Sequence, residues 1–312
     1  MDGFVPSTAL AVVESQILMK PLKQALDTIT HEEKADKNKA KHLLNAVTLT
    51  LTHRKKCPEC KEQDYLLGNE CPCGETKLQA LDEVVMVLHA MSGDMTSFQS
   101  VEFTSEMFSR MEVHRTVQRN VSWQLLYDMA DFVQKQHKGN TVRLEIHHDT
   151  LKVNWNADDS DDTDAGTYNV PLMIETENDE IQHIPLHKMI PVQLNAQDFL
   201  ERIPNRTGTV ISFSIANGLF KIHGKTEHSA EYTTHIALPP DTIGALQAIN
   251  LSAWKPAMHI KYTAHLRKAA LQSSNLIFYI QQDPIFVFQF KVPGMDAMKP
   301  GRILTYVNAA VQ

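Results

Sequence analysis

Most of the chain alternates short apolar runs with Gly, Pro, Asn or Asp, and this pattern predicts antiparallel strands. In the run at 45–53, Val47, Leu49 and Leu51 alternate with threonines, as in a strand. The run at 209–225 is interrupted by Asn217-Gly218, a dipeptide typical of a tight hairpin turn. Further strands are predicted at 78–91, 98–108, 141–156, 231–239, 275–282, 285–292 and 302–311.

Four segments instead repeat apolar residues with helical spacing. The clearest is 121–140, where Leu125, Met129, Phe132 and Val133 are predicted to form one apolar stripe. The other predicted helices are 14–29, 195–203 and 261–275.

These elements divide the chain into two halves with a similar set of predicted helices and strands. Each half contains two helices and many short strands, although the halves share no residue-level repeat. The sequence therefore predicts an α+β protein with a first domain at 1–167, an extended connector at 168–189 and a second domain at 190–312.

Composition narrows the class of protein. The 312 residues are 43% hydrophobic and carry a formal net charge of -7, as in many globular proteins. No run of eighteen apolar residues occurs, so no transmembrane helix is expected, and the first residues do not resemble a signal peptide. The four cysteines lie between positions 57 and 73, which favours a reducing compartment over a secreted disulfide scaffold.

A family resemblance rests on several segments taken in order along the chain. They are Leu78-Gln79-Ala80-Leu81-Asp82 with the strand that follows, the hairpin at 139–155, residues 180–185, the hairpin at 209–225, Asp283-Pro284 through Val287, and Tyr306. Together these segments resemble the PCNA-type DNA sliding clamps. Two departures from the clamp pattern are an insertion at about 53–77 and the run Asn308-Ala309-Ala310 near the C-terminus.

The resemblance implies a clamp fold with antiparallel sheets outside and helices lining a central hole. It further implies a homotrimeric ring that encircles duplex DNA, is opened by a clamp loader, and tethers a DNA polymerase and other proteins through clamp-binding peptides. Such a protein works without catalysis, in the nucleus or another intracellular site of replication, including the replication compartment of a virus-infected cell.

The insertion contains Cys57, Cys60, Cys71 and Cys73 beside turn-forming Pro and Gly residues. A C-x-x-C knuckle followed by C-x-C-G can place four thiolates around one tetrahedral Zn²⁺. Since four sulfur ligands leave no open position, the predicted zinc is structural.

Basic residues recur on every predicted helix. Such residues usually form a solvated face, but the resemblance implies sequence-independent contacts to DNA phosphates. The candidates are Lys20, Lys23, Lys135, Lys138, Arg202, Arg206, Lys261, Arg267 and Lys268, and the final helix, with three cations and no carboxylate, is the strongest.

Two further surfaces are implied by the resemblance. A groove for partner peptides is expected at Leu81, Met86, Leu88, Ile181, Ile184, Pro284, Tyr306 and Val307, each of which could equally belong to the sheet core. The subunit interface is expected to pair Leu151, Val153 and Trp155 of one chain with Tyr232, Thr234 and Ile236 of the next.

Two other functions stay open at this point. One is a clamp-like checkpoint or viral late-transcription factor, which would keep the fold but work as a monomer or hetero-oligomer. The other is a zinc-ribbon transcription or RNA-processing factor with an α+β scaffold. The acidic run at 158–166 lacks the glycine and the final glutamate of a calcium loop, and no nucleotide-binding or catalytic motif is present.

Overall fold

The computed structural model describes most of the chain, in two compact units. The described residues are 9–29, 46–59, 77–91, 97–136, 141–155, 165–173, 186, 189–203, 210–225, 231–246, 251, 254–259, 263–280, 285–294 and 300–309. The first unit consists of residues 1–90, 102–183 and 294–301, and the second of residues 91–101, 184–293 and 302–312. Within the described residues, no helix is long and apolar enough to span a membrane.

The first unit is built mainly from strands. Its elements are β1 (Ala11–Ser15), α1 (Met19–Ile29), β2 (Ala46–Lys56), β3 (Gln79–Met91), the 3-10 turn η1 (Ser105–Met107), β5 (Arg110–Val113), β6 (Val117–Ser122), α2 (Trp123–Gln136), β7 (Val142–Ile146), β8 (Thr150–Trp155) and β9 (Gly166–Met173). Strands β4 (Ser97–Phe103) and β17 (Pro300–Ala309) each have residues in both units.

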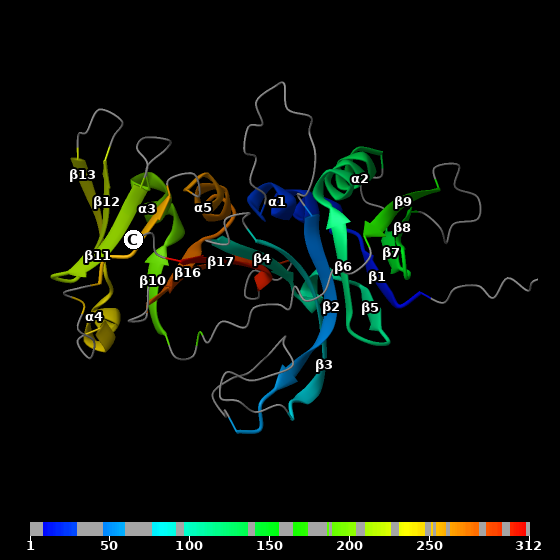
Figure 1. Cartoon of the computed structure of the whole chain (residues 1–312), viewed down its shortest axis with the longest axis horizontal. Coiled ribbons are helices and arrows are strands. Elements are labelled where there is room, and N and C mark those ends of the chain that lie inside the picture. The colour runs from blue at the N-terminus through cyan, green and yellow to red at the C-terminus, as the bar shows by residue number, and fades with distance from the viewer. Residues whose placement is uncertain are drawn as a thin grey trace, which may run out of the picture. The chain divides into compact units, whose positions relative to one another are not determined.

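The strands of the first unit pair in the order β3-β2-β6-β9-β8-β7-β1-β5, each antiparallel to its neighbours. Helices α1 and α2 lie side by side against this sheet (Figure 1). Pro21 sits in the first turn of α1, where a missing backbone N–H costs nothing.

Helix α2 differs from its predicted apolar stripe. Leu126, Met129 and Val133 are buried, whereas Leu125 and Phe132 are exposed. The predicted stripe was thus wrong at two positions, because both faces of this helix carry apolar residues and periodicity alone does not choose between them.

The second unit contains β10 (Ile190–Asn195), α3 (Ala196–Arg202), β11 (Val210–Ala216), β12 (Leu219–Lys225), β13 (Glu231–Ala237), α4 (Pro240–Leu246), β14 (Ala257–His259), α5 (Thr263–Ala270), β15 (Asn275–Ile280) and β16 (Ile285–Pro293). Helix α4 was not predicted, so this unit has one helix more than the sequence pattern indicated.

Two antiparallel sheets enclose the core of the second unit. One has the order β10-β15-β16-β17 and the other β13-β12-β11-β14. Phe213 of the second sheet packs against Phe278, Phe286 and Phe288 of the first, with ring centroids 5.5 to 5.8 Å apart. The predicted turn between β11 and β12 is confirmed, since Asn217 and Gly218 have positive φ values of 55° and 71°.

Two predicted boundaries are corrected by the strands. Residues 168–173, expected in the connector, belong to β9 and pair with β8 and β6. The inserted segment starts later than position 53, because β2 continues to Lys56, which pairs with Gln79 at the start of β3.

Candidate functional site

In the first unit, the helix pair α1–α2 holds three of the predicted DNA-binding lysines. Lys23 of α1 forms an ion pair with Asp131 of α2, and Lys135 binds the other oxygen of the same carboxylate at 2.6 Å. Lys23 also lies 5.3 Å from the centre of the Tyr127 ring. Lys20 is exposed, and no described residue forms an ion pair with it.

Charge in this cluster is partly cancelled. The hydrogen bond to Asp131 raises the pKa of Lys23, and the hydrogen bonds from Lys135 and Lys23 lower the pKa of Asp131. Both shifts favour the ionised forms of Lys23 and Asp131, so the Asp131 carboxylate offsets part of the positive charge of this cluster. Sequence reasoning missed Asp131, although its spacing of four residues from Lys135 is that of a helical ion pair.

In the second unit, Arg267 has a structural role that the sequence did not reveal. Its guanidinium Nη1 donates to the carbonyl oxygens of Leu200 and Ile203, at 2.8 and 2.9 Å. These carbonyls lie at the C-terminal end of α3, where unpaired acceptors and the helix dipole favour a cation. Arg267 thus joins α5 to α3, and it is not a cation held free for DNA as expected.

The remaining cations of these helices divide into paired, exposed and undescribed residues. Arg202 binds the carboxylate of Asp198 at 3.3 Å, one turn earlier in α3. Lys268 of α5 is exposed. Lys138, Arg206 and Lys261 lie outside the described residues.

The pairing of β8 shows that half of the predicted subunit interface does not lie on a strand edge. Strand β8 is paired with β7 on one side and with β9 on the other, so Leu151, Val153 and Trp155 are buried inside a sheet. Their alternating apolar pattern is that of a strand in a sheet interior as much as that of an edge. Among the described strands, β9 has no partner beyond β8 along Gly166–Pro171, and Pro171 contributes no N–H to this edge.

The other half of the predicted interface does lie on an edge. Strand β13 pairs with β12 on one side, and no described strand pairs with its other side. It carries Tyr232, Thr234 and Ile236, of which Ile236 is buried.

An exposed aromatic side chain lies beside the β9 edge. Phe132 of α2 is 43% exposed, although its ring contacts Trp155 of β8 at 5.9 Å and Tyr168 of β9 at 6.0 Å between centroids. Leu125 of α2 and Met173 of β9 are also exposed. Met173 lies on the opposite face of β9 from Tyr168, because side chains alternate along a strand. Phe132 is therefore the exposed apolar side chain that lies beside the unpaired strand, which is a feature of protein interfaces.

The predicted zinc site falls largely outside the described residues. Cys57 follows β2 directly and is fully buried, while Cys60, Cys71 and Cys73 are not described. Among the described residues, no three His, Cys, Asp or Glu side chains are grouped as metal ligands. The zinc site stays a prediction.

The predicted peptide groove has most of its described members in the two cores. Met86 and Leu88 are buried in the first unit. In the second unit Tyr306 is only 2% exposed, and its ring meets that of Phe290 edge to face at 5.9 Å. Leu81 and Val307 are half-buried, and Ile181, Ile184 and Pro284 lie outside the described residues.

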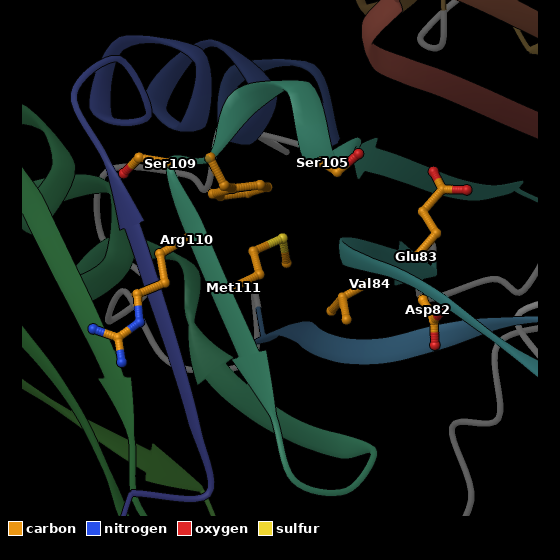
Figure 2. Close-up of a pocket in the computed structure, with 8 residues that line it drawn as sticks. Asp82, Glu83, Val84, Ser105, Ser109, Arg110 and Met111 are labelled. Carbon is orange, nitrogen blue, oxygen red and sulfur yellow. The ribbon is translucent and has the colours of Figure 1, made fainter.

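A cavity of about 340 Å³ lies in the first unit at the start of β3 (Figure 2). Its charged ends are already paired, since Glu83 binds Arg54 and Arg110 binds Glu112. Between them lies an apolar floor, and the full lining is Asp82, Glu83, Val84, Ser105, Phe108, Ser109, Arg110 and Met111. Nothing in this set pairs a nucleophile with a base.

Comparison with known proteins identifies the fold. No family model matches the chain, and no curated protein matches its sequence. Among solved structures, the chain is similar to the crystal structure of Proliferating Cellular Nuclear Antigen from Entamoeba histolytica, with a TM-score of 0.61 and 10% sequence identity. The match covers 98% of this chain and 100% of that chain. The chain therefore has the fold of a PCNA-type DNA sliding clamp.

Proposed function

We propose that the chain is the subunit of a DNA sliding clamp, a ring that encircles duplex DNA and tethers a DNA polymerase and other replication proteins. The observation that carries this proposal is the clamp fold, which extends over 98% of the chain. The two helix pairs α1–α2 and α3–α5 support it, because each presents cations that suit DNA phosphates.

The work of such a ring is topological. A closed ring cannot leave circular DNA by sliding, so its retention needs no tight contact with the duplex. Phosphate contacts from exposed lysines such as Lys20 and Lys268 are independent of base sequence and let the ring move. A partner held on the ring meets the DNA at a raised effective concentration.

Ring closure requires two different strand edges on each chain, and β9 and β13 supply them. In this proposal β9 of one chain pairs with β13 of the next, in place of the buried β8. The exposed Phe132 beside β9 would then be covered by the neighbouring subunit. Repeated head to tail, this contact closes into a ring, and three copies give the predicted homotrimer.

The insertion adds a feature to this clamp. It joins the paired ends of β2 and β3, and its four cysteines would hold one structural Zn²⁺. Partner peptides would bind in the predicted groove. The half-buried Val307 is a better probe of that groove than Tyr306, because replacing the buried Tyr306 would disturb the core. A clamp loader and an intracellular site of DNA replication belong to the same proposal.

The decisive experiment measures mass and topological retention together. We expect the purified chain to have about three times its 35.3 kDa mass in solution. With a clamp loader, the chain should stay on nicked circular DNA in high salt and be lost when that circle is cut. A chain that is monomeric at every concentration, or that is retained equally on circular and linear DNA, would contradict the proposal.

A further inference from the structure

The sheet β13-β12-β11-β14 of the second unit has one face in the core and one face turned away from it. Phe213, Phe220 and Ile222 are buried on the core face. Thr234 lies on the same face, and its hydroxyl donates to the backbone oxygen of Arg202 in α3. Because side chains alternate along a strand, the residues between these lie on the opposite face. We call this second face the lysine face; its half-buried and exposed residues include Ser212, Ser214, Lys221, His223, Lys225, Glu231, Thr233 and His235.

Positive charge is gathered near the centre of the lysine face. The pKa of His223 is lowered by burial and then by the charges of Lys221 and Lys255, the second of which precedes β14. The ammonium groups of both lysines therefore act on one imidazole. That ring is held by hydrogen bonds with the hydroxyl groups of Ser214 and Thr233, at 2.7 and 2.9 Å.

This charge is not cancelled by the described neighbours. No described residue forms an ion pair with Lys221 or Lys255. The described residues of the four strands contain one carboxylate, Glu231, and it lies opposite Lys225, at the other end of β12 from Lys221. Like charges placed side by side on a sheet are unfavourable, so the lysine face suits an anionic partner.

The other side chains of the lysine face indicate which anionic partner fits. Among its described residues there is no aromatic ring, and Leu219, half-buried at the hairpin turn, is the one large apolar side chain. Single-stranded nucleic acid binds largely by stacking its bases on aromatic rings, and protein partners usually need an aromatic or apolar anchor. A DNA duplex needs neither, because contacts to its phosphates supply the affinity. Hydroxyl and ammonium groups are common donors to phosphate oxygens.

We propose that the lysine face is a second DNA-binding surface, which contacts the phosphate backbone of a duplex through Lys221 and Lys255. It is separate from the helices of the same unit, because the bond from Thr234 to Arg202 places α3 on the core side of the sheet. A duplex that lies along α3 and α5 therefore leaves the lysine face open to another duplex segment. Each chain carries the whole face, so this binding does not depend on ring formation.

Lysine footprinting with an acetylating reagent tests the proposal on the full-length wild-type chain. An excess of a short duplex of mixed sequence should slow the acetylation of Lys221 and Lys255 about tenfold at 50 mM salt, and this protection should be lost at 1 M salt, where phosphate contacts no longer hold the duplex. Lys56 and Lys291 are exposed outside the lysine face, and they should react equally with and without DNA. The measurement needs no substitution, so it does not depend on the folding of a variant.

A pair of charge variants tests whether the lysine face binds a duplex by itself. Lys221→Gln with Lys255→Gln should remove one bound duplex per chain at saturation, as measured by analytical ultracentrifugation at low salt. Lys56→Gln with Lys291→Gln makes the same change in net charge and should leave the number of bound duplexes unchanged.

Three results would overturn the proposal. One is an equal acetylation rate of Lys221 and Lys255 with and without duplex, and another is an equal loss of duplex in both variants. The third is protection by polyglutamate or single-stranded DNA but not by the duplex, which would make the face a site for an acidic protein or for a single strand. Ring formation is measured separately by mass. A chain that never forms a ring but shows the expected protection would refute the proposed clamp function and leave the lysine face as a duplex-binding surface.

Discussion

Asp131 should limit how strongly the first unit binds DNA. Its carboxylate holds both Lys23 and Lys135, so Asp131→Asn should release two ammonium groups for phosphate contacts. Each contact adds about 0.9 to the slope of log affinity against log salt, so the variant should steepen that slope by about 1.8. Between 50 and 200 mM salt its affinity should then fall about twelvefold more than that of the wild type.

The assay is fluorescence anisotropy with a short linear duplex, which measures direct contact without ring loading. Asp128→Asn is the matched control, because Asp128 lies on the same helix and bonds to Gln124, not to a lysine. It removes the same charge without releasing a cation. If both variants change the slope equally, only net charge has acted. If neither changes it, α1 and α2 do not face the duplex.

The remaining predictions concern other parts of the molecule. Arg267→Ala should lower the free energy of unfolding by about 1–3 kcal/mol, because it leaves the end of α3 without its donor; urea denaturation measures this, and a neutral result would mean that water replaces the guanidinium. Cys60→Ser should lower bound zinc well below one per chain in metal analysis while the ring persists, and wild-type protein without zinc would refute the site. Phe132→Ala should raise the dissociation constant of the ring about thirtyfold, as for an aromatic interface anchor, whereas Leu271→Ala, at the exposed end of α5, should not change it. Burial lowers the pKa of His223 from 6.5, so the unfolded chain takes up this proton more readily and stability falls as pH drops through that range. The Tm of His223→Asn should therefore change less than that of the wild type between pH 7 and 5, and parallel profiles would exclude this histidine as a cause.

The sequence could predict those parts of the fold that depend on residues close together in the chain. Asn217-Gly218 specifies its turn because both residues tolerate positive φ. The alternation in β2 specifies a strand, although the structure buries its threonine face as well as its apolar face. The α+β class and the clamp fold follow from the order of such elements, and both are confirmed by the structure.

Partners far apart in the sequence could not be predicted in this way. The choice between Leu125 and Leu126 as the buried residue of α2 depends on the sheet beneath the helix. The edge role of β9 depends on which strands pair, and β8 has the same apolar alternation as an edge strand. Arg267 has the positive charge of a DNA-binding residue, and only the position of α3 in the structure shows that it binds a helix end.

In the proposed ring, the unequal edges β9 and β13 would also determine how assembly can go wrong. A contact that joins two different edges does not by itself limit the number of subunits. A small error in the angle between subunits therefore turns a closed ring into a growing filament. Pro171 works against this outcome, because a strand that lacks an N–H at this point supports only a short ladder. Closure of the proposed ring would cover both of these edges, so the unassembled chain, and not the finished ring, is the form in which they are open to aggregation. A cell that makes this protein would then need to keep free subunits scarce, and the ratio of ring to single chain becomes a property on which selection can act.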